Sequence, residues 1–205
     1  FIMKILYISN GLTHYYNLVL SKLNSKPNIE IVVVAPANRS SYVGDGVKQT
    51  IEGINFKVVE LEEYSYLFYS DFKGLSKTIA TEKPDIIITL APYLHSFWLN
   101  LFVARVMKRL NVGLILKSIP FRLIPYQERL DDINNNNQFF STLPTFINIF
   151  ISKVGLMKQL KMIILAMQKK ALNIPDAHVN YIEAFELLST YGVNREAVFV
   201  TRNSP

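Results

Sequence analysis

Residues 3–23 read MKILYISNGLTHYYNLVLSKL and contain an apolar run, a polar turn and a segment of helical periodicity. Residues 5–8 have the composition of a strand buried on both faces. Residues 9–13 are turn formers, and Gly11 tolerates backbone angles that other residues avoid. Apolar residues then recur at helical spacing, at Tyr15, Leu18, Val19 and Leu23. This order predicts the first half of a βαβ unit.

The same alternation continues along the chain. Apolar runs predict further strands over residues 29–35, 55–61, 85–90, 112–119, 177–182 and 197–201. Helices are predicted over residues 69–82, 94–110 and 183–190, and Gly192 stands where a left-handed residue ends a helix. The pattern indicates an α/β fold, a Rossmann-like, doubly wound, mainly parallel sheet of about seven strands with helices on both faces. We expect a single domain over residues 3–201, followed by the start of a linker at residues 202–205.

Composition limits the classes of partner and chemistry. Half of the 205 residues are hydrophobic and 19% are charged, which excludes a disordered chain. The absence of cysteine excludes disulfides, thiolate metal sites and a cysteine nucleophile, and suits a cytoplasmic protein. The net charge of +6 is most commonly that of a basic surface in water, and an anionic membrane or a phosphorylated substrate explains it equally well as a partner. The lysines are scattered and no nucleic-acid motif is present, so we expect no nucleic-acid partner.

Residues 139–170 are densely apolar, but lysines, Pro144 and Gly155 interrupt them. Charges and helix breakers argue against a membrane-spanning helix. Two interpretations stay open with equal weight. The segment forms core helices of a large domain, or it forms an interfacial patch that contacts an anionic membrane at the inner face of the cytoplasmic membrane.

Several short motifs together resemble one family, glycosyltransferase family 4 of the glycosyl transferases group 1 type. Residues 3–23 are similar to its first strand, loop and helix, and residues 83–88 resemble its fourth strand. The remaining motifs resemble the end of the family's N-terminal domain: Lys170-Ala171-Leu172, Asp176-Ala177-His178-Val179, Glu183-Ala184, Tyr191-Gly192-Val193, Val198-Phe199-Val200 and Arg202-Asn203-Ser204-Pro205. Their order and spacing, which span nearly the whole chain, carry the resemblance.

The resemblance implies a GT-B enzyme with two Rossmann-like domains facing a cleft. This chain would be the N-terminal half of a retaining glycosyltransferase of hexosyltransferase type and would bind a glycan or lipid-linked acceptor. The nucleotide-sugar would act as co-substrate through a C-terminal domain outside this sequence, with no metal and no other cofactor. The resemblance also implies a role in polysaccharide biosynthesis, and it implies that residues 1–205 alone are inactive.

The sequence departs from the family at the site. Its first loop has Gly11 where members often have two glycines, and the histidines common after the fourth and fifth strands are missing. We name no general base, and His95 is the one candidate to replace a missing histidine. The residues expected at the substrate and donor cleft are Asn10, Gly11, Thr13, His14, Pro92, His95, Lys117 and Arg122.

We infer the roles of these cleft residues from their positions in the predicted strands and helices. His14 begins a helix, where the dipole favours an anion, although a lone histidine there also serves as a cap or surface residue. Lys117 and Arg122 could hold an acceptor phosphate, or could be solvated charges at the rim. Strand order leads us to expect Asn10, His14 and His95 along one cleft at the carboxyl ends of the strands.

Two other functions remain open. A Rossmann-like nucleotide-binding oxidoreductase or epimerase is disfavoured, because the first loop lacks G-x-G-x-x-G and the second strand ends in Val34-Ala35-Pro36 without an acidic residue. A non-catalytic binding domain is the other alternative. The sequence does not specify a sugar, a nucleotide or a linkage.

Overall fold

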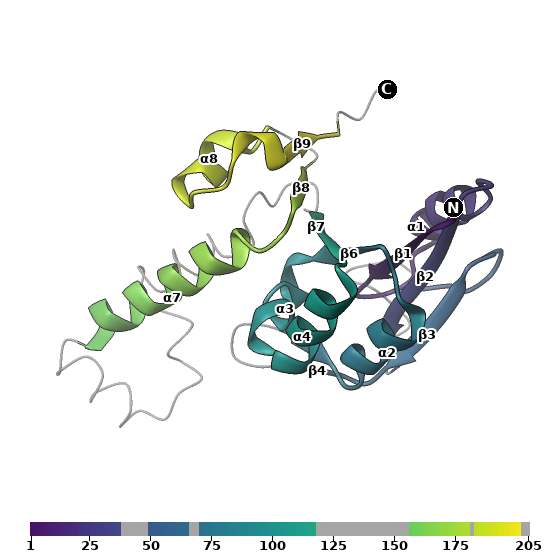
Figure 1. The fold of residues 1–205 in the computed structure, drawn as a ribbon, viewed down its shortest axis with the longest axis horizontal. Coiled ribbons are helices and arrows are strands. Elements are labelled where there is room, and N and C mark those ends of the chain that lie inside the picture. The colour runs from purple at the N-terminus through teal and green to yellow at the C-terminus, as the bar shows by residue number, and fades with distance from the viewer. Residues whose placement is uncertain (38–48, 66–69, 118–155, 181–182, 202–205) are drawn as a thin grey trace. The chain divides into compact units, whose positions relative to one another are not determined.

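The computed structural model describes residues 1–37, 49–65, 70–117, 156–180 and 183–201 (Figure 1). Its centre is a seven-stranded sheet of order β3-β2-β1-β6-β7-β8-β9. The strands are β1 (Met3–Ile8), β2 (Ile29–Pro36), β3 (Lys57–Leu61), β6 (Ile86–Leu90), β7 (Gly113–Lys117), β8 (Ala177–Asn180) and β9 (Val198–Val200). The registers from β3 to β8 are parallel, and helices lie on both faces. The predicted Rossmann-like α/β fold is confirmed.

The residues group into two compact units. The first contains residues 1–117 and 174–179, and the second contains residues 118–173 and 180–205. The single domain expected over residues 3–201 stays a prediction. The expected linker at 202–205 and the patch residues 139–155 lie outside the described residues.

The first unit holds most of the sheet and five short helical segments. These are α1 (His14–Asn24), α2 (Leu75–Glu82), η1 (Ala91–Tyr93), α3 (Ser96–Leu99) and α4 (Leu101–Leu110). A separate antiparallel hairpin pairs β4 (Glu63–Ser65) with β5 (Ser70–Phe72). In the second unit, α7 (Leu156–Leu172), α8 (Phe185–Thr190) and η2 (Arg195–Ala197) accompany β9. Gly192 has φ of +84°, as the sequence predicted for the residue that follows this helix end.

Two predicted helices are wrong in extent. The helix expected over 69–82 begins only at Leu75, because residues 70–72 form the second strand of the hairpin. The helix expected over 94–110 is broken at Asn100, whose backbone is extended. The Asn100 side chain accepts hydrogen bonds from the N–H groups of Phe102 and Val103 and so begins α4 anew.

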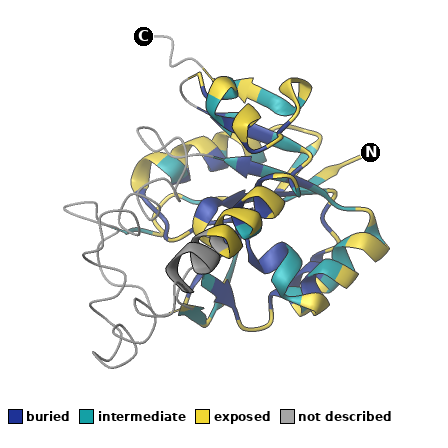
Figure 2. Cartoon of the chain, turned by 90° about the vertical axis from the view of Figure 1, so that its left-hand side faces the viewer, coloured by how far each residue is buried: buried dark blue, intermediate teal, exposed yellow. Residues whose placement is uncertain are grey.

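Helix α1 forms where predicted, but its buried face is not the apolar one. Asn17 and Leu20 are buried, whereas the apolar residues that marked the helical spacing are exposed: Tyr15, Leu18, Val19 and Leu23. Asn17 Nδ2 donates to the carbonyl oxygen of Thr50 at 2.6 Å, and this bond holds the polar side of the helix inward. Figure 2 shows buried strands next to helices whose outer faces are exposed.

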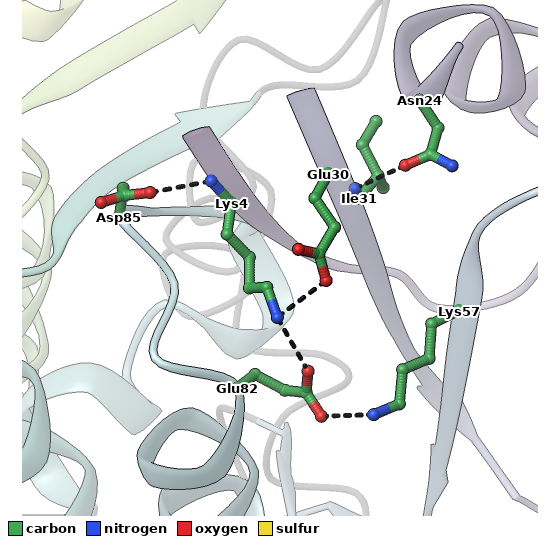
Figure 3. A network of polar contacts seen from close by, with 7 residues as sticks. All are labelled: Lys4, Asn24, Glu30, Ile31, Lys57, Glu82 and Asp85. Carbon is green, nitrogen blue, oxygen red and sulfur yellow. Dashed lines mark hydrogen bonds and ion pairs between the residues drawn. The ribbon is translucent and has the colours of Figure 1, made fainter. Parts of the chain in front are cut away.

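Ionic contacts fix the amino ends of the strands (Figure 3). Lys4 Nζ lies 2.7 Å from Glu30 and 3.5 Å from Glu82, and Lys57 Nζ lies 2.7 Å from Glu82. The hydrogen bond from Lys57 leads the effects that lower the pKa of the Glu82 carboxyl group. Glu82 therefore remains ionised at the end of α2 and connects that helix to β1 and β3.

A Pro-Asp pair precedes each of two strands, and its aspartate forms the same two hydrogen bonds to the neighbouring strand. Asp85 precedes β6, donates its N–H to the Lys4 carbonyl at 2.9 Å and accepts the Lys4 N–H on Oδ2 at 2.8 Å. Asp176 precedes β8 and makes the equivalent pair of bonds to Leu114 of β7, at 2.8 and 2.7 Å. Each aspartate thus sets the register of its strand against the neighbouring strand.

Candidate functional site

The loop after β1 uses its own backbone donors internally. The Ser9 N–H donates to the Val34 carbonyl at 3.0 Å, and the Gly11 N–H donates to Ser9 Oγ at 3.2 Å. The Leu12 N–H donates to Gln49 Oε1 at 3.3 Å. Gly11 is buried and has no positive φ, so the freedom of glycine is not used there. A phosphate would have to displace these acceptors to bind the loop amides.

The carboxyl end of β7 carries a lysine that contacts this strand–loop–helix unit. Lys117 Nζ lies 4.4 Å from the centre of the Tyr16 ring and 5.6 Å from the centre of the Tyr7 ring. It also lies 3.5 Å from Tyr7 Oη. Tyr7 belongs to β1 and Tyr16 to the first turn of α1, so Lys117 connects β7 to the strand–loop–helix unit across β6.

Burial lowers the pKa of the Lys117 ammonium group to about 8, because the charged form loses contact with water. Lys117 is therefore mainly a cation at pH 7, but it loses its charge under mildly basic conditions. The two tyrosine rings offer it their negative faces, and aromatic faces stabilise a partly desolvated cation. An anion that reached this position would meet a charge that water screens poorly.

The first turn of α1 adds exposed polar groups. Asn10 and His14 are exposed, and Thr13 is 2% exposed at the N-cap position. The Thr13 side chain does not cap the helix, and its Oγ1 has no hydrogen-bond partner among the described residues. The Thr13 side chain therefore supplies none of the acceptors that the first backbone N–H groups of a helix need.

His95 has a different environment from the one expected of a substrate ligand. It is 2% exposed, and its Nδ1 accepts a hydrogen bond from Trp98 Nε1 at 3.2 Å. Pro92, three residues earlier in η1, is exposed. A proton acceptor must reach its substrate, and His95 is covered in this conformation.

A polar network that the sequence did not predict holds the segment around His95. Asp71 of the hairpin accepts hydrogen bonds from Tyr64 Oη and Asn100 Nδ2, at 3.0 and 2.9 Å. Tyr93 Oη donates to Glu63 at 3.1 Å, and Ser96 Oγ donates to the Ser70 carbonyl at 2.9 Å. Burial, followed by the nearby Glu63 charge, raises the pKa of Tyr93, which keeps this hydroxyl protonated as a donor.

The expected site residues thus come together only in part. Lys117 joins the first turn of α1 through Tyr16, whereas His95 contacts Trp98. Arg122 lies outside the described residues, and a common cleft for Asn10, His14 and His95 stays a prediction. The sequence signal that was missed is Tyr7, an aromatic hydroxyl in an otherwise aliphatic strand.

The described parts of the chain contain neither a cluster of metal-binding side chains nor a helix that could cross a membrane. No group of three or more histidine, aspartate or glutamate side chains there could hold a metal ion. Among these residues, none of the helices is both long and apolar enough to cross a bilayer.

Comparisons with known proteins add distant likenesses. No family model matches the chain, and no curated protein matches it. A dodecameric FMN-dependent UbiX-like decarboxylase from Escherichia coli O157:H7 superposes with a TM-score of 0.39 at 12% identity, over 67% of this chain and 76% of that one. The calicheamicin glycosyltransferase CalG4 superposes with a TM-score of 0.44 at 10% identity, over 97% of this chain and 52% of that one. The chain therefore spans about half the length of that glycosyltransferase. The fold defines the class of a Rossmann-like α/β protein, and Lys117 lies at the carboxyl edge of its sheet.

Proposed function

We propose that this chain is the acceptor-binding part of a glycosyltransferase, and that it binds a phosphate-bearing ligand at the carboxyl edge of β1, β6 and β7. The observation that carries the proposal is the position of Lys117 against Tyr16 in the first turn of α1. A partly buried cation and a helix N-terminus both favour an anion, and here they adjoin one another.

The strand order supports the same location. β2 and β3 continue from β1 on one side, and β6 and β7 continue on the other, so the direction of chain progression reverses between β1 and β6. Ligands of open parallel sheets bind outside the carboxyl ends of the strands at such a switch point. Asn10 and His14 are exposed beside it and could bind sugar hydroxyl groups.

The reaction class comes from the family resemblance described above. An acceptor hydroxyl oxygen forms a bond to the anomeric carbon of a nucleotide-sugar, and the bond from that carbon to the phosphate oxygen breaks. Its electron pair leaves with the diphosphate, whose oxygen takes up the proton of the acceptor hydroxyl group. In this scheme the chain positions the acceptor, and Lys117 stabilises phosphate charge. We assign no general base, because His95 is covered.

Titration calorimetry with a panel of nucleoside diphosphates, nucleotide-sugars and sugar phosphates tests the proposal. We expect a sugar phosphate, which resembles the acceptor, to bind and the nucleotide-sugars not to bind. Lys117→Met should weaken binding of the sugar phosphate at least about tenfold, because a hydrogen bond to a charged group is worth roughly 1.5–3 kcal/mol. Lys77→Met, at an exposed position of α2, is the matched control and should leave affinity unchanged. An equal loss of affinity in both variants, tight binding of a nucleotide-sugar by this chain, or binding of a nicotinamide dinucleotide in place of the sugar phosphate would contradict the proposal.

A further inference from the structure

The second unit carries exposed apolar side chains on the helix α7. Met162, Ile163 and Leu165 are 63%, 55% and 41% exposed. The helix is nevertheless anchored, because Gln168 and Leu172 are 2% and 1% exposed. One side of α7 is therefore buried, and Met162, Ile163 and Leu165 are the large apolar side chains exposed among its described residues.

Basic side chains accompany this apolar surface, and acidic ones are missing from it. Lys169 and Lys170 are exposed in the last turn of α7. The sequence of this helix also contains Lys158 and Lys161. The sequence has no aspartate or glutamate from residue 133 to residue 175. Exposed methionine, isoleucine and leucine within a stretch of purely positive charge are typical of a helix that lies at a lipid interface.

A hollow adjoins the same helix. Leu165, Ala166 and Lys169 of α7 line it together with Thr190 and Tyr191, and its volume is about 350 Å³. Asn173 Nδ2 donates to the carbonyl oxygens of Lys169 and Tyr191, at 2.7 and 2.8 Å, and fixes the two walls. The hollow combines an apolar wall with an ammonium group and a hydroxyl group, which suits a lipid phosphate next to its acyl chains.

We propose that the α7 face, defined as Met162, Ile163, Leu165, Lys169 and Lys170, contacts an anionic lipid bilayer. The apolar side chains would enter the boundary of the acyl region, and the lysines would meet lipid phosphates. Charge complementarity favours this occupant. A second copy of the chain would place lysines against lysines, and a nucleic acid would leave the apolar side chains uncovered. The inference is independent of glycosyl transfer.

Vesicle co-sedimentation of the whole chain tests the inference. The vesicles are phosphatidylcholine alone, or phosphatidylcholine with about 30% phosphatidylserine, which gives a negative surface potential. We expect binding to the anionic vesicles only, with a decrease at high salt because screening weakens it. Lys169→Gln with Lys170→Gln should weaken binding roughly 30-fold, since each lysine near such a surface contributes about one kcal/mol.

Apolar and control variants make the test specific. Met162→Ser with Leu165→Ser should weaken binding about tenfold or more, because buried apolar area is lost. Leu18→Ser with Val19→Ser removes two apolar side chains of α1 that are 59% and 57% exposed, and should leave binding unchanged. Circular dichroism confirms that each variant is folded, as expected for changes at exposed positions.

Three results would overturn the inference. These are the absence of binding to anionic vesicles, equal binding to both vesicle types, and equal losses in the α1 and α7 variants. Analytical ultracentrifugation tests the remaining alternative, in which a second copy of the chain covers the α7 face. If Met162→Ser with Leu165→Ser turns a dimer into a monomer and does not change vesicle binding, a second copy covers the α7 face and the bilayer does not.

Discussion

The ammonium nitrogen of Lys117 lies 4.4 Å from the centre of the Tyr16 ring, although the two residues are far apart in the sequence. Lys117 ends β7 and Tyr16 lies in the first turn of α1. This contact places a partly desolvated cation next to a helix N-terminus. It is the structural basis of the proposed anion site, and it also has consequences for stability and for pH dependence.

Lys117→Met should stabilise the protein at pH 7 by about 1 kcal/mol, because a partly buried charge is replaced by an apolar side chain of similar length. The pKa of Lys117 is lowered from 10.5 to about 8 by burial. Between these values the unfolded chain binds more protons than the folded one, so wild-type stability rises with pH. The advantage of the variant should therefore shrink from pH 7 to pH 10, as measured by urea unfolding. A variant less stable than the wild type at pH 7 would contradict this prediction.

The affinity of the phosphate-bearing ligand should fall above pH 8. Only the protonated amine attracts an anion, and above a pKa of about 8 each pH unit removes roughly a further tenfold of that form. Lys117→Arg should retain affinity up to pH 10, because a guanidinium group stays charged. Calorimetry from pH 7 to pH 10 in buffers of matched ionic strength measures the affinity of the wild type and of Lys117→Arg. Parallel pH profiles for the wild type and Lys117→Arg would exclude Lys117 as the titrating group.

Glu82→Gln should destabilise the protein at neutral pH by about 1–2 kcal/mol, since the ionised side chain joins Lys57 and Lys4 and is 8% exposed. The folded-state pKa of Glu82 is lowered, chiefly by the hydrogen bond from Lys57. Its contribution is therefore complete above pH 4.5, its ordinary value, and is lost as the pH falls through the lowered folded value. Wild type and variant should converge in acid. The control is Glu62→Gln, which breaks an exposed pair with Lys73 and should change stability by less than about 0.5 kcal/mol.

Much of the sheet could be predicted because its strands are short, continuous apolar runs. Residues 29–35 and 85–90 lack the polar alternation of a half-exposed strand, so they had to be buried on both faces. The end of α8 was predictable for a similar reason, since Gly192 suits a left-handed residue. These features depend on local chemistry, which periodicity and turn residues record.

Tertiary contacts decided the features that were predicted wrongly. The spacing of Leu18 and Val19 predicts a helix but does not say which side packs, and the Asn17–Thr50 hydrogen bond turns the polar side inward. Residues 70–72 form a strand because residues 63–65 pair with them. An apolar sequence around Asn100 favours a continuous helix, but the Asn100 side chain forms a new N-cap.

The candidate site was predictable only as a location. Lys117 stands at the carboxyl end of a predicted strand, so the sequence places it near the crevice. Its partners Tyr7 and Tyr16 come from β1 and α1, and their contact with Lys117 depends on the strand order. The burial of His95 beside Trp98 likewise depends on tertiary contacts that the sequence did not reveal.

The two Pro-Asp pairs provide the most local test of how this sheet is specified. Asp85→Ala and Asp176→Ala should each cost about 1 kcal/mol, because each removes one acceptor for a strand N–H. Asparagine at either position keeps an oxygen acceptor and should cost less. Hydrogen exchange distinguishes the two sites. Of these two amides, Asp85→Ala should speed exchange of the Lys4 N–H alone, and Asp176→Ala should speed exchange of the Leu114 N–H alone. Glu52→Ala, at an exposed loop position, should change neither. Equal acceleration at both amides in one variant would show general destabilisation and contradict a local role in register.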